Sequence, residues 1–139
     1  MSRELSGVMD QLIVGWNSHD PDQVLPFYHP ACQGIDVGQA RPQNGREGIR
    51  QTLRRYWDAF PDLTIVNHEM VIQDERAAVS WVGRGTHHGH MMNIPPTHRA
   101  VEVRGMSFFQ FEDGLVIRST HVWDVAGLLR ALRLLPELE

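Results

Sequence analysis

The sequence predicts one α+β domain in which helices come first and a largely antiparallel sheet follows. Apolar residues recur at helical spacing over about residues 3–17, and again in a segment that begins near Gly45. After Pro61, apolar and polar residues alternate with the period of strands. The chain has 139 residues, which suits a single hydrophobic core. Helices that precede a strand meander are typical of α+β layer folds.

Four helices are expected where apolar stripes and capping signals agree. The first has an apolar stripe made of Leu5, Val8, Met9, Leu12, Ile13 and Trp16. Asp20 followed by Pro21 predicts the N-cap and first position of a short second helix. The third helix opens at Gly45 and is closed by Pro61, and a short last helix covers about residues 125–132.

The sheet is expected to contain one early strand and a later meander. The predicted strands cover about residues 33–37, 62–73, 77–87, 100–111 and 115–123. Asp113-Gly114 indicates a two-residue hairpin. Regular pairing from this turn places Met106 opposite His121 and Val103 opposite Asp124. Both hairpin faces are then apolar, so we expect helices to cover one face and a second subunit the other, in a homodimer.

Composition and charge argue against several classes of partner. The net charge is -4, and all 13 positive residues are scattered arginines, so no basic stripe suits nucleic acid. Residues 1–10 lack a long apolar run, which argues against a signal peptide or membrane contact and favours a cytoplasmic protein. Cys32 is the only cysteine, so no internal disulfide forms, and a buried apolar role is favoured over a nucleophile.

Five motifs occur in order along nearly the whole chain. They are Trp16-Asn17-Ser18-His19-Asp20, Ala59-Phe60-Pro61-Asp62-Leu63, Gly85-Thr86-His87 with Gly89 and Ile94-Pro95-Pro96-Thr97, Phe109-Gln110-Phe111-Glu112-Asp113-Gly114, and Trp123-Asp124-Val125-Ala126-Gly127-Leu128-Leu129. Together they resemble the SnoaL-like polyketide cyclases of the nuclear transport factor 2-like superfamily. The resemblance implies a cone-shaped barrel, in which a strongly bent, mostly antiparallel sheet and three N-terminal helices enclose a deep pocket.

The resemblance also implies a chemistry. The family's cyclases close a ring in a polyketide ester by intramolecular aldol condensation, without a metal or cofactor. Their catalytic aspartate, the general acid and base, corresponds to Asp124. The chain departs from the family at Arg118-Ser119, where an acidic residue is usual, and at Ala131-Leu132-Arg133, where glutamine-leucine-glycine is usual. A non-catalytic binding module and a ketosteroid isomerase-like or epoxide hydrolase-like enzyme stay open as alternatives.

Asp124 and His121 are the candidate catalytic residues. Apolar neighbours would raise the pKa of the Asp124 carboxyl and make it a better base, although it could equally be the N-cap of the last helix. Regular alternation directs His121 to the face opposite Asp124, so only a bulge would bring both into one pocket. His121 could instead lie at the sheet surface or a subunit interface.

The remaining candidates concern ligand binding. Bulky residues expected around a pocket for a flat, apolar or aromatic carbonyl substrate are Trp16, Trp57, Phe60, Trp81, Met91, Met92 and Met106, although most such residues belong to a core. Arg104 could pair with an enolate or carboxylate, or form a surface or interface ion pair. His87-His88-Gly89-His90 has neither a nearby cysteine nor helical His-x-x-x-His spacing, so we favour a solvated loop over a metal site.

Overall fold

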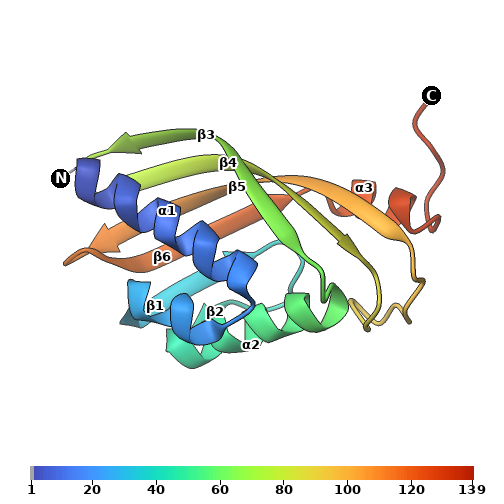
Figure 1. Cartoon of the computed structure of the whole chain (residues 1–139), viewed down its shortest axis with the longest axis horizontal. Coiled ribbons are helices and arrows are strands. Elements are labelled where there is room, and N and C mark those ends of the chain that lie inside the picture. The colour runs from blue at the N-terminus through green and yellow to red at the C-terminus, as the bar shows by residue number, and fades with distance from the viewer. Residues whose placement is uncertain (1) are drawn as a thin grey trace.

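A strongly bent six-stranded sheet forms the framework of the computed structural model (Figure 1). The structure describes residues 2–139, with side chains from Glu4 onward. The strands are β1 (Tyr28–Asp36), β2 (Gln43–Asn44), β3 (Thr64–Gln73), β4 (Arg76–Thr86), β5 (Ala100–Glu112) and β6 (Leu115–Trp123). Their order in the sheet is β2-β1-β6-β5-β4-β3, and every neighbouring pair is antiparallel except β1 and β6, which are parallel.

The long helices α1 (Ser2–Ser18) and α2 (Gly45–Ala59) pack on the concave face of this sheet (Figure 1). The short helix α3 (Val125–Ala131) follows β6. The predicted second helix is instead two 3-10 turns, η1 (Pro21–Gln23) and η2 (Leu25–Phe27). Asp20 does cap the first turn, because its Oδ1 accepts a hydrogen bond of 2.9 Å from the Asp22 amide. The predicted α+β cone class is confirmed.

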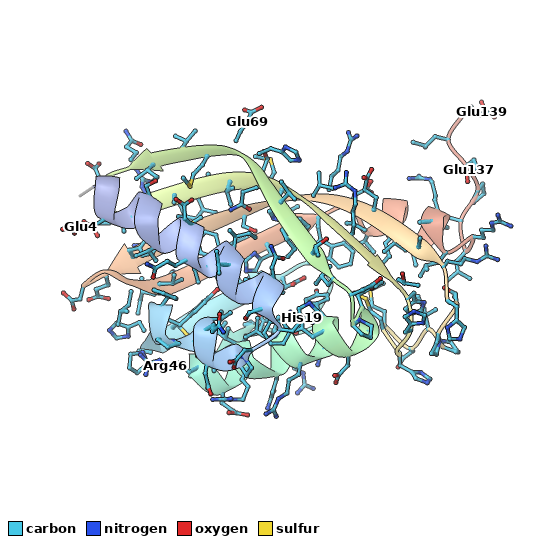
Figure 2. The ribbon with its side chains drawn as sticks, viewed as in Figure 1. Glu4, His19, Arg46, Glu69, Glu137 and Glu139 are labelled. Atoms are coloured by element: carbon cyan, nitrogen blue, oxygen red, sulfur yellow. The ribbon has the colours of Figure 1, made fainter. Side chains whose placement is uncertain are left out.

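The core lies between the helices and the concave face. Its largest cluster joins α1, α2 and the strands through residues such as Met9, Leu53, Val79 and Phe109. Cys32 is part of this cluster and is buried, as predicted. The charged side chains labelled in Figure 2 lie on the outside of the molecule. None of the described helices is long and apolar enough to cross a membrane.

A bulge in β6 corrects the predicted hairpin register. Glu112 pairs with Leu115 as predicted, but the register shifts between Gln110 and Phe111. Phe111 pairs with Val116 and Gln110 with Arg118, so one extra residue of β6, Ile117, is left over. Because side chains alternate along a strand, every β6 side chain after this extra residue points to the opposite face of the sheet from the one that regular pairing predicts.

The reversal brings His121 to the concave face. Ser107, not Met106, lies opposite His121, and Met106 lies opposite Val122. Trp123 turns inward with His121, whereas the side chains of Met106 and Val122 are exposed on the outer face, by 60% and 53%. The bulge therefore decides which residues of β6 line the interior.

Candidate functional site

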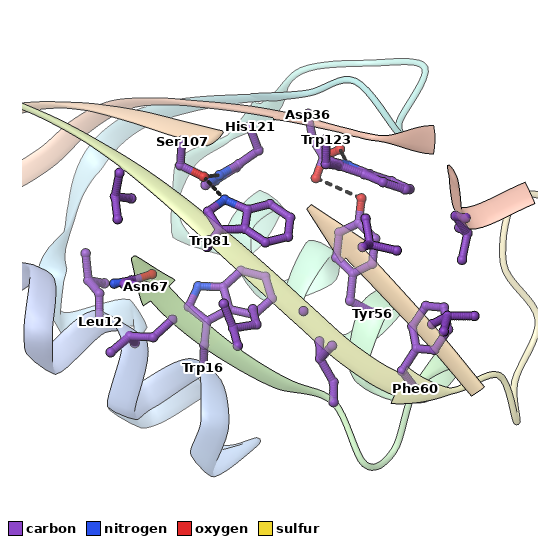
Figure 3. Close-up of a pocket in the computed structure, with 18 of the residues that line it drawn as sticks. Leu12, Trp16, Asp36, Tyr56, Phe60, Asn67, Trp81, Ser107, His121 and Trp123 are labelled. Atoms are coloured by element: carbon purple, nitrogen blue, oxygen red, sulfur yellow. Dashed lines mark hydrogen bonds between the residues drawn. The ribbon is translucent and has the colours of Figure 1, made fainter. Parts of the chain in front are cut away.

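A pocket opens between the concave sheet and the helices α1 and α2 (Figure 3). Its cavity volume is about 120 Å³, and the total reaches about 930 Å³ only when the open space at its mouth is counted. Most of its wall is aromatic or aliphatic, including Trp16, Phe60, Trp81 and Phe109. Such a wall suits a flat, apolar ligand. Polar groups are few, so each restricts the orientation that a ligand can adopt.

Asp36, at the end of β1, is the one acidic residue among the described residues that line the pocket. Its side chain is only 5% exposed. Oδ1 accepts hydrogen bonds from the Gly38 amide at 2.7 Å and from Trp123 Nε1 at 2.9 Å. Oδ2 accepts a hydrogen bond of 2.8 Å from the Tyr56 hydroxyl. Three donors thus compensate the buried carboxylate.

The Tyr56 hydroxyl is held in its protonated form. Burial raises the pKa of Tyr56 well above its usual range, and the negative charge of Asp36 and the hydrogen bond to it act in the same direction. Tyr56 is therefore a hydrogen-bond donor at neutral pH. The Asp36 oxygens already accept three hydrogen bonds, so a ligand would have to compete with these donors for the carboxylate.

His121 belongs to a second chain of hydrogen bonds (Figure 3). Its Nδ1 lies 2.6 Å from Ser107 Oγ, and Trp81 Nε1 donates to the same oxygen at 2.9 Å. Since an indole N–H is only a donor, Ser107 keeps both its proton and a lone pair for the imidazole. The hydroxyl can then donate to a bare Nδ1 or accept from a protonated one.

The backbone at Gly105 permits this arrangement. A Cβ atom at that position would overlap the ring carbons of Trp81. Trp81 and Gly105 are cross-strand partners, and Ser107 lies two residues further along β5. The absence of a side chain at Gly105 therefore lets the indole lie across β5 and reach Ser107.

The environment keeps His121 neutral at pH 7. Burial lowers the pKa of its imidazole below the ordinary value of 6.5, and the nearby negative charge of Asp36 opposes this shift. Asp36 and His121 pair across the parallel strands β1 and β6. Nε2 of His121 makes no hydrogen bond to a described residue, and the ring lines the pocket. This nitrogen is thus available to a ligand.

Several predicted site residues do lie in the pocket. His121, Trp16, Phe60, Trp81 and Met91 all line it. They come from β6, α1, the end of α2, β4 and the loop after β4.

Five predicted site residues lie elsewhere. Met92 does not line the pocket and packs, half-buried, against a core cluster. Asp124 is exposed, and its Oδ1 accepts a hydrogen bond of 2.8 Å from the Gly127 amide, so it is the N-cap of α3. Trp57 is buried in the core, where it stacks on His19. Arg104 and Met106 are exposed on the outer face of β5, because the inward positions of that strand are the odd-numbered ones.

Sequence reasoning missed Asp36, Ser107, Tyr56 and Asn67 as pocket residues. A signal existed for Asp36, since one polar residue between Ile35 and Val37 on a strand points to the opposite face from its neighbours. Nothing local distinguishes Ser107, whose role depends on His121 being turned inward by the bulge.

The histidine-rich loop lies beside the pocket without forming an evident metal centre. The predicted solvated loop is wrong for His87, which is fully buried with its ring near that of Phe60, and burial lowers the pKa of its imidazole. His88 Nδ1 lies 3.0 Å from His98 Nδ1. Within residues 2–139, no three His, Cys, Asp or Glu side chains are grouped so as to hold a metal ion.

Comparison with known proteins agrees with this architecture. The structure is similar to TsrD from Streptomyces laurentii, with a TM-score of 0.85 and 26% identity over 96% of this chain and 97% of that one. It is also similar to a SnoaL-like polyketide cyclase from Agrobacterium tumefaciens, with a TM-score of 0.79 and 23% identity over 92% and 97% of the two chains.

The sequence comparisons identify a family but no close relative among curated proteins. No curated protein matches the sequence significantly. The family model described as SnoaL-like polyketide cyclase matches residues 7–132, which is most of the chain. This match confirms the resemblance that the five motifs indicate. The chain therefore belongs to the SnoaL-like polyketide cyclase family.

Proposed function

We propose that the protein catalyses a cofactor-independent intramolecular aldol condensation of a flat, apolar polyketide-like carbonyl compound, with His121 as the general acid and base. The single observation that carries this proposal is the free Nε2 of a neutral imidazole in an apolar pocket. Asp36 already accepts three hydrogen bonds from the protein, and Asp124 is outside the pocket and caps α3, so we assign the role of base to His121.

The proposed reaction begins with a proton transfer. Nε2 of His121 takes the proton of a C–H bond that two carbonyl groups flank, and an enolate forms. For Nε2 to be bare, the neutral ring must carry its proton on Nδ1, and Ser107 Oγ accepts the hydrogen bond that fixes this tautomer. The charge of Asp36 then stabilises the imidazolium that forms.

Ring closure returns the proton. The enolate carbon attacks a second carbonyl carbon of the same molecule, a C–C bond forms, and the carbonyl π pair moves to oxygen. The alkoxide takes the proton from Nε2–H, which restores neutral His121. The apolar walls hold the chain folded, so that the two reacting carbons stay close. No group is consumed.

The test is His121→Asn, which cannot carry the proton between two atoms of the substrate. Turnover of a polyketide ester with a C–H between two carbonyls should fall by a factor on the order of 100 to 10,000. Asp124→Asn is the matched control and should keep parental turnover, because its carboxylate lies outside the pocket.

A fully active His121→Asn protein would overturn the assignment of the base. A parent protein that binds such esters but turns over none would favour the non-catalytic binding module on the same fold.

We further propose that the protein acts as a homodimer through the outer face of its sheet. Met106, Phe108, Val122 and Ile35 are exposed there by 60%, 42%, 53% and 50%. Register connects them, since Met106 pairs with Val122, while Phe108 and Ile35 both pair with Thr120. A contiguous apolar patch of this kind marks an interaction surface.

Light scattering at micromolar concentration should therefore give the mass of two chains for the parent protein and of one chain for Met106→Glu. Val14→Glu is the control, since Val14 is equally exposed, by 63%, but lies on α1. A monomeric parent protein would remove this proposal.

A further inference from the structure

The pocket has a second polar region, on the wall made by α1 and β3 (Figure 3). Trp16 of α1 and Asn67 of β3 lie there. In the sheet, β3 is an edge strand, three places away from β6, which carries His121. Since neighbouring strands are about 4.8 Å apart, the two strands are separated by roughly 14 Å along the sheet. This region thus faces a different part of a ligand than His121 does.

Trp16 differs from the other tryptophans because its indole N–H has no hydrogen-bond acceptor among the described residues. Of the four tryptophans, Trp57 donates to the Trp16 carbonyl at 3.1 Å, Trp81 to Ser107, and Trp123 to Asp36. Trp16 Nε1 has no acceptor among the described residues, although its ring is half-buried and lines the pocket. This nitrogen is not among the unpaired polar atoms that the protein encloses completely, so a ligand in the pocket can reach the donor.

Asn67 is a second pocket residue whose polar group has no hydrogen-bond partner among the described residues. Its half-buried side chain lines the pocket, and its carboxamide makes no hydrogen bond to a described residue. Asn17 is a useful contrast, because its Nδ2 donates to the Ile65 carbonyl at 2.9 Å and its Oδ1 accepts from the Ile65 amide at 2.7 Å. That pair of bonds fixes α1 against β3 beside Trp16 and Asn67. Both unpaired groups are therefore held by rigid elements.

We propose that Trp16 Nε1–H and the Asn67 carboxamide form a subsite that binds a neutral carbonyl oxygen at the end of the ligand remote from His121. The indole is only a donor, and the carboxamide supplies further donors, so the subsite suits an acceptor. No arginine is among the described lining residues, and Asp36 is negative, so an anionic group would lack a counter-charge.

This inference deepens the proposed function, since it assumes that the substrate occupies the same pocket. It adds that the substrate carries a neutral carbonyl outside the two groups that react. It also makes Trp16 and Asn67 specificity-determining residues. A site built to hydrogen-bond one group discriminates against an analogue that lacks it, because its donors are then left unpaired.

The test compares 9-fluorenone with fluorene, two flat tricyclic probes that differ by one carbonyl oxygen. The four indole N–H groups give separate signals in a proton–nitrogen correlation spectrum, and Trp16→Phe identifies the Trp16 signal by removing it. Fluorenone should move the Trp16 indole proton downfield, as a new hydrogen bond does, whereas fluorene should not. Equal movement with both probes, or none with fluorenone, would overturn the proposal.

A second measurement tests Asn67. Asn67→Leu keeps the size of the side chain and removes its polar atoms, so fluorenone should bind about fivefold to tenfold more weakly, the worth of one net hydrogen bond. Fluorene affinity should not fall. His68→Leu is the matched control, because His68 is the next residue of β3 and is exposed outside the pocket. An equal loss of affinity for both probes would show a merely structural role.

The single carbonyl of fluorenone could also be bound by His121, so the titration is repeated in His121→Phe. In this variant, fluorenone should still move the Trp16 signal downfield. If the signal does not move in His121→Phe, the proposed subsite is wrong. These binding results are independent of turnover. If His121→Asn loses turnover but Asn67→Leu binds fluorenone as well as the parent protein does, only the subsite is wrong. If Asn67→Leu binds fluorenone more weakly but His121→Asn keeps its turnover, only the proposed reaction is wrong.

Discussion

Asp36 and Asp124 occupy similar places in the sequence but different places in the protein. Each comes at or just after the end of a strand, and the two strands, β1 and β6, are parallel neighbours. Each also stands between apolar residues. Yet Asp36 is buried in the pocket with three donors, whereas Asp124 is exposed and caps α3. Apolar neighbours along the chain therefore do not determine whether a carboxylate is buried.

The difference arises from where each carboxylate finds its donors. Asp36 is bound by Tyr56 and Trp123, which are 20 and 87 residues away in the chain. Asp124 finds its donor three residues later, at Gly127. A Cβ atom at Gly127 would overlap the Asp124 carboxylate, so this glycine leaves room for the cap. Each aspartate accepts a hydrogen bond from a nearby backbone amide, Gly38 or Gly127, but only Asp36 has two distant side-chain donors in addition, and these compensate its burial.

The largest expected effect on stability follows from changing Asp36. Asp36→Asn keeps the shape of the side chain but places an NH2 group where a donor already points, and it removes the charge that strengthens all three bonds. We expect a loss of about 2–4 kcal/mol in the free energy of unfolding, measured by urea denaturation. A loss no greater than that of a surface substitution would mean that the three bonds do not stabilise the fold.

The same comparison predicts how His121 titrates. The negative charge of Asp36 raises the pKa of His121 against the larger effect of burial, so Asp36→Asn should lower this pKa further. Asp124→Asn should leave it unchanged, and NMR titration of the imidazole measures both. Because the folded pKa lies below 6.5, His121 contributes stability above that pH which is lost as the pH falls through the lowered pKa. An equal shift in both variants would contradict the distinction between the two aspartates.

The smallest effects are expected at Asp124. Asp124→Ala removes the cap and should cost about 1 kcal/mol, whereas Asp124→Asn should cost only a few tenths, since asparagine caps about as well. Thermal unfolding distinguishes the two variants, and turnover should be normal in both once the fraction folded is taken into account. A specific loss of turnover in Asp124→Asn, with stability unchanged, would return Asp124 to the catalytic role that the family resemblance implies.

Local sequence was sufficient where the structure depends on local interactions. The stripe from Leu5 to Trp16, the Asp20 cap and the Asp113-Gly114 turn each specify their element through residues a few positions apart, and all three are present. The five motifs also identified the family, because they report the order of elements along the chain. The N-cap alternative for Asp124 was likewise readable from the residues that follow it.

Only the tertiary structure decided which side chains meet in the pocket. Leu115, Val116 and Ile117 are all apolar, so the sequence offers no alternation that would reveal the extra residue in β6. The bulge arises from pairing with β5, and it determines that His121 and Trp123, rather than Val122, face inward. Side-chain direction along a strand is preserved only while pairing is regular, so the contacts of His121 with Ser107 and of Trp123 with Asp36 depend on the assembled sheet.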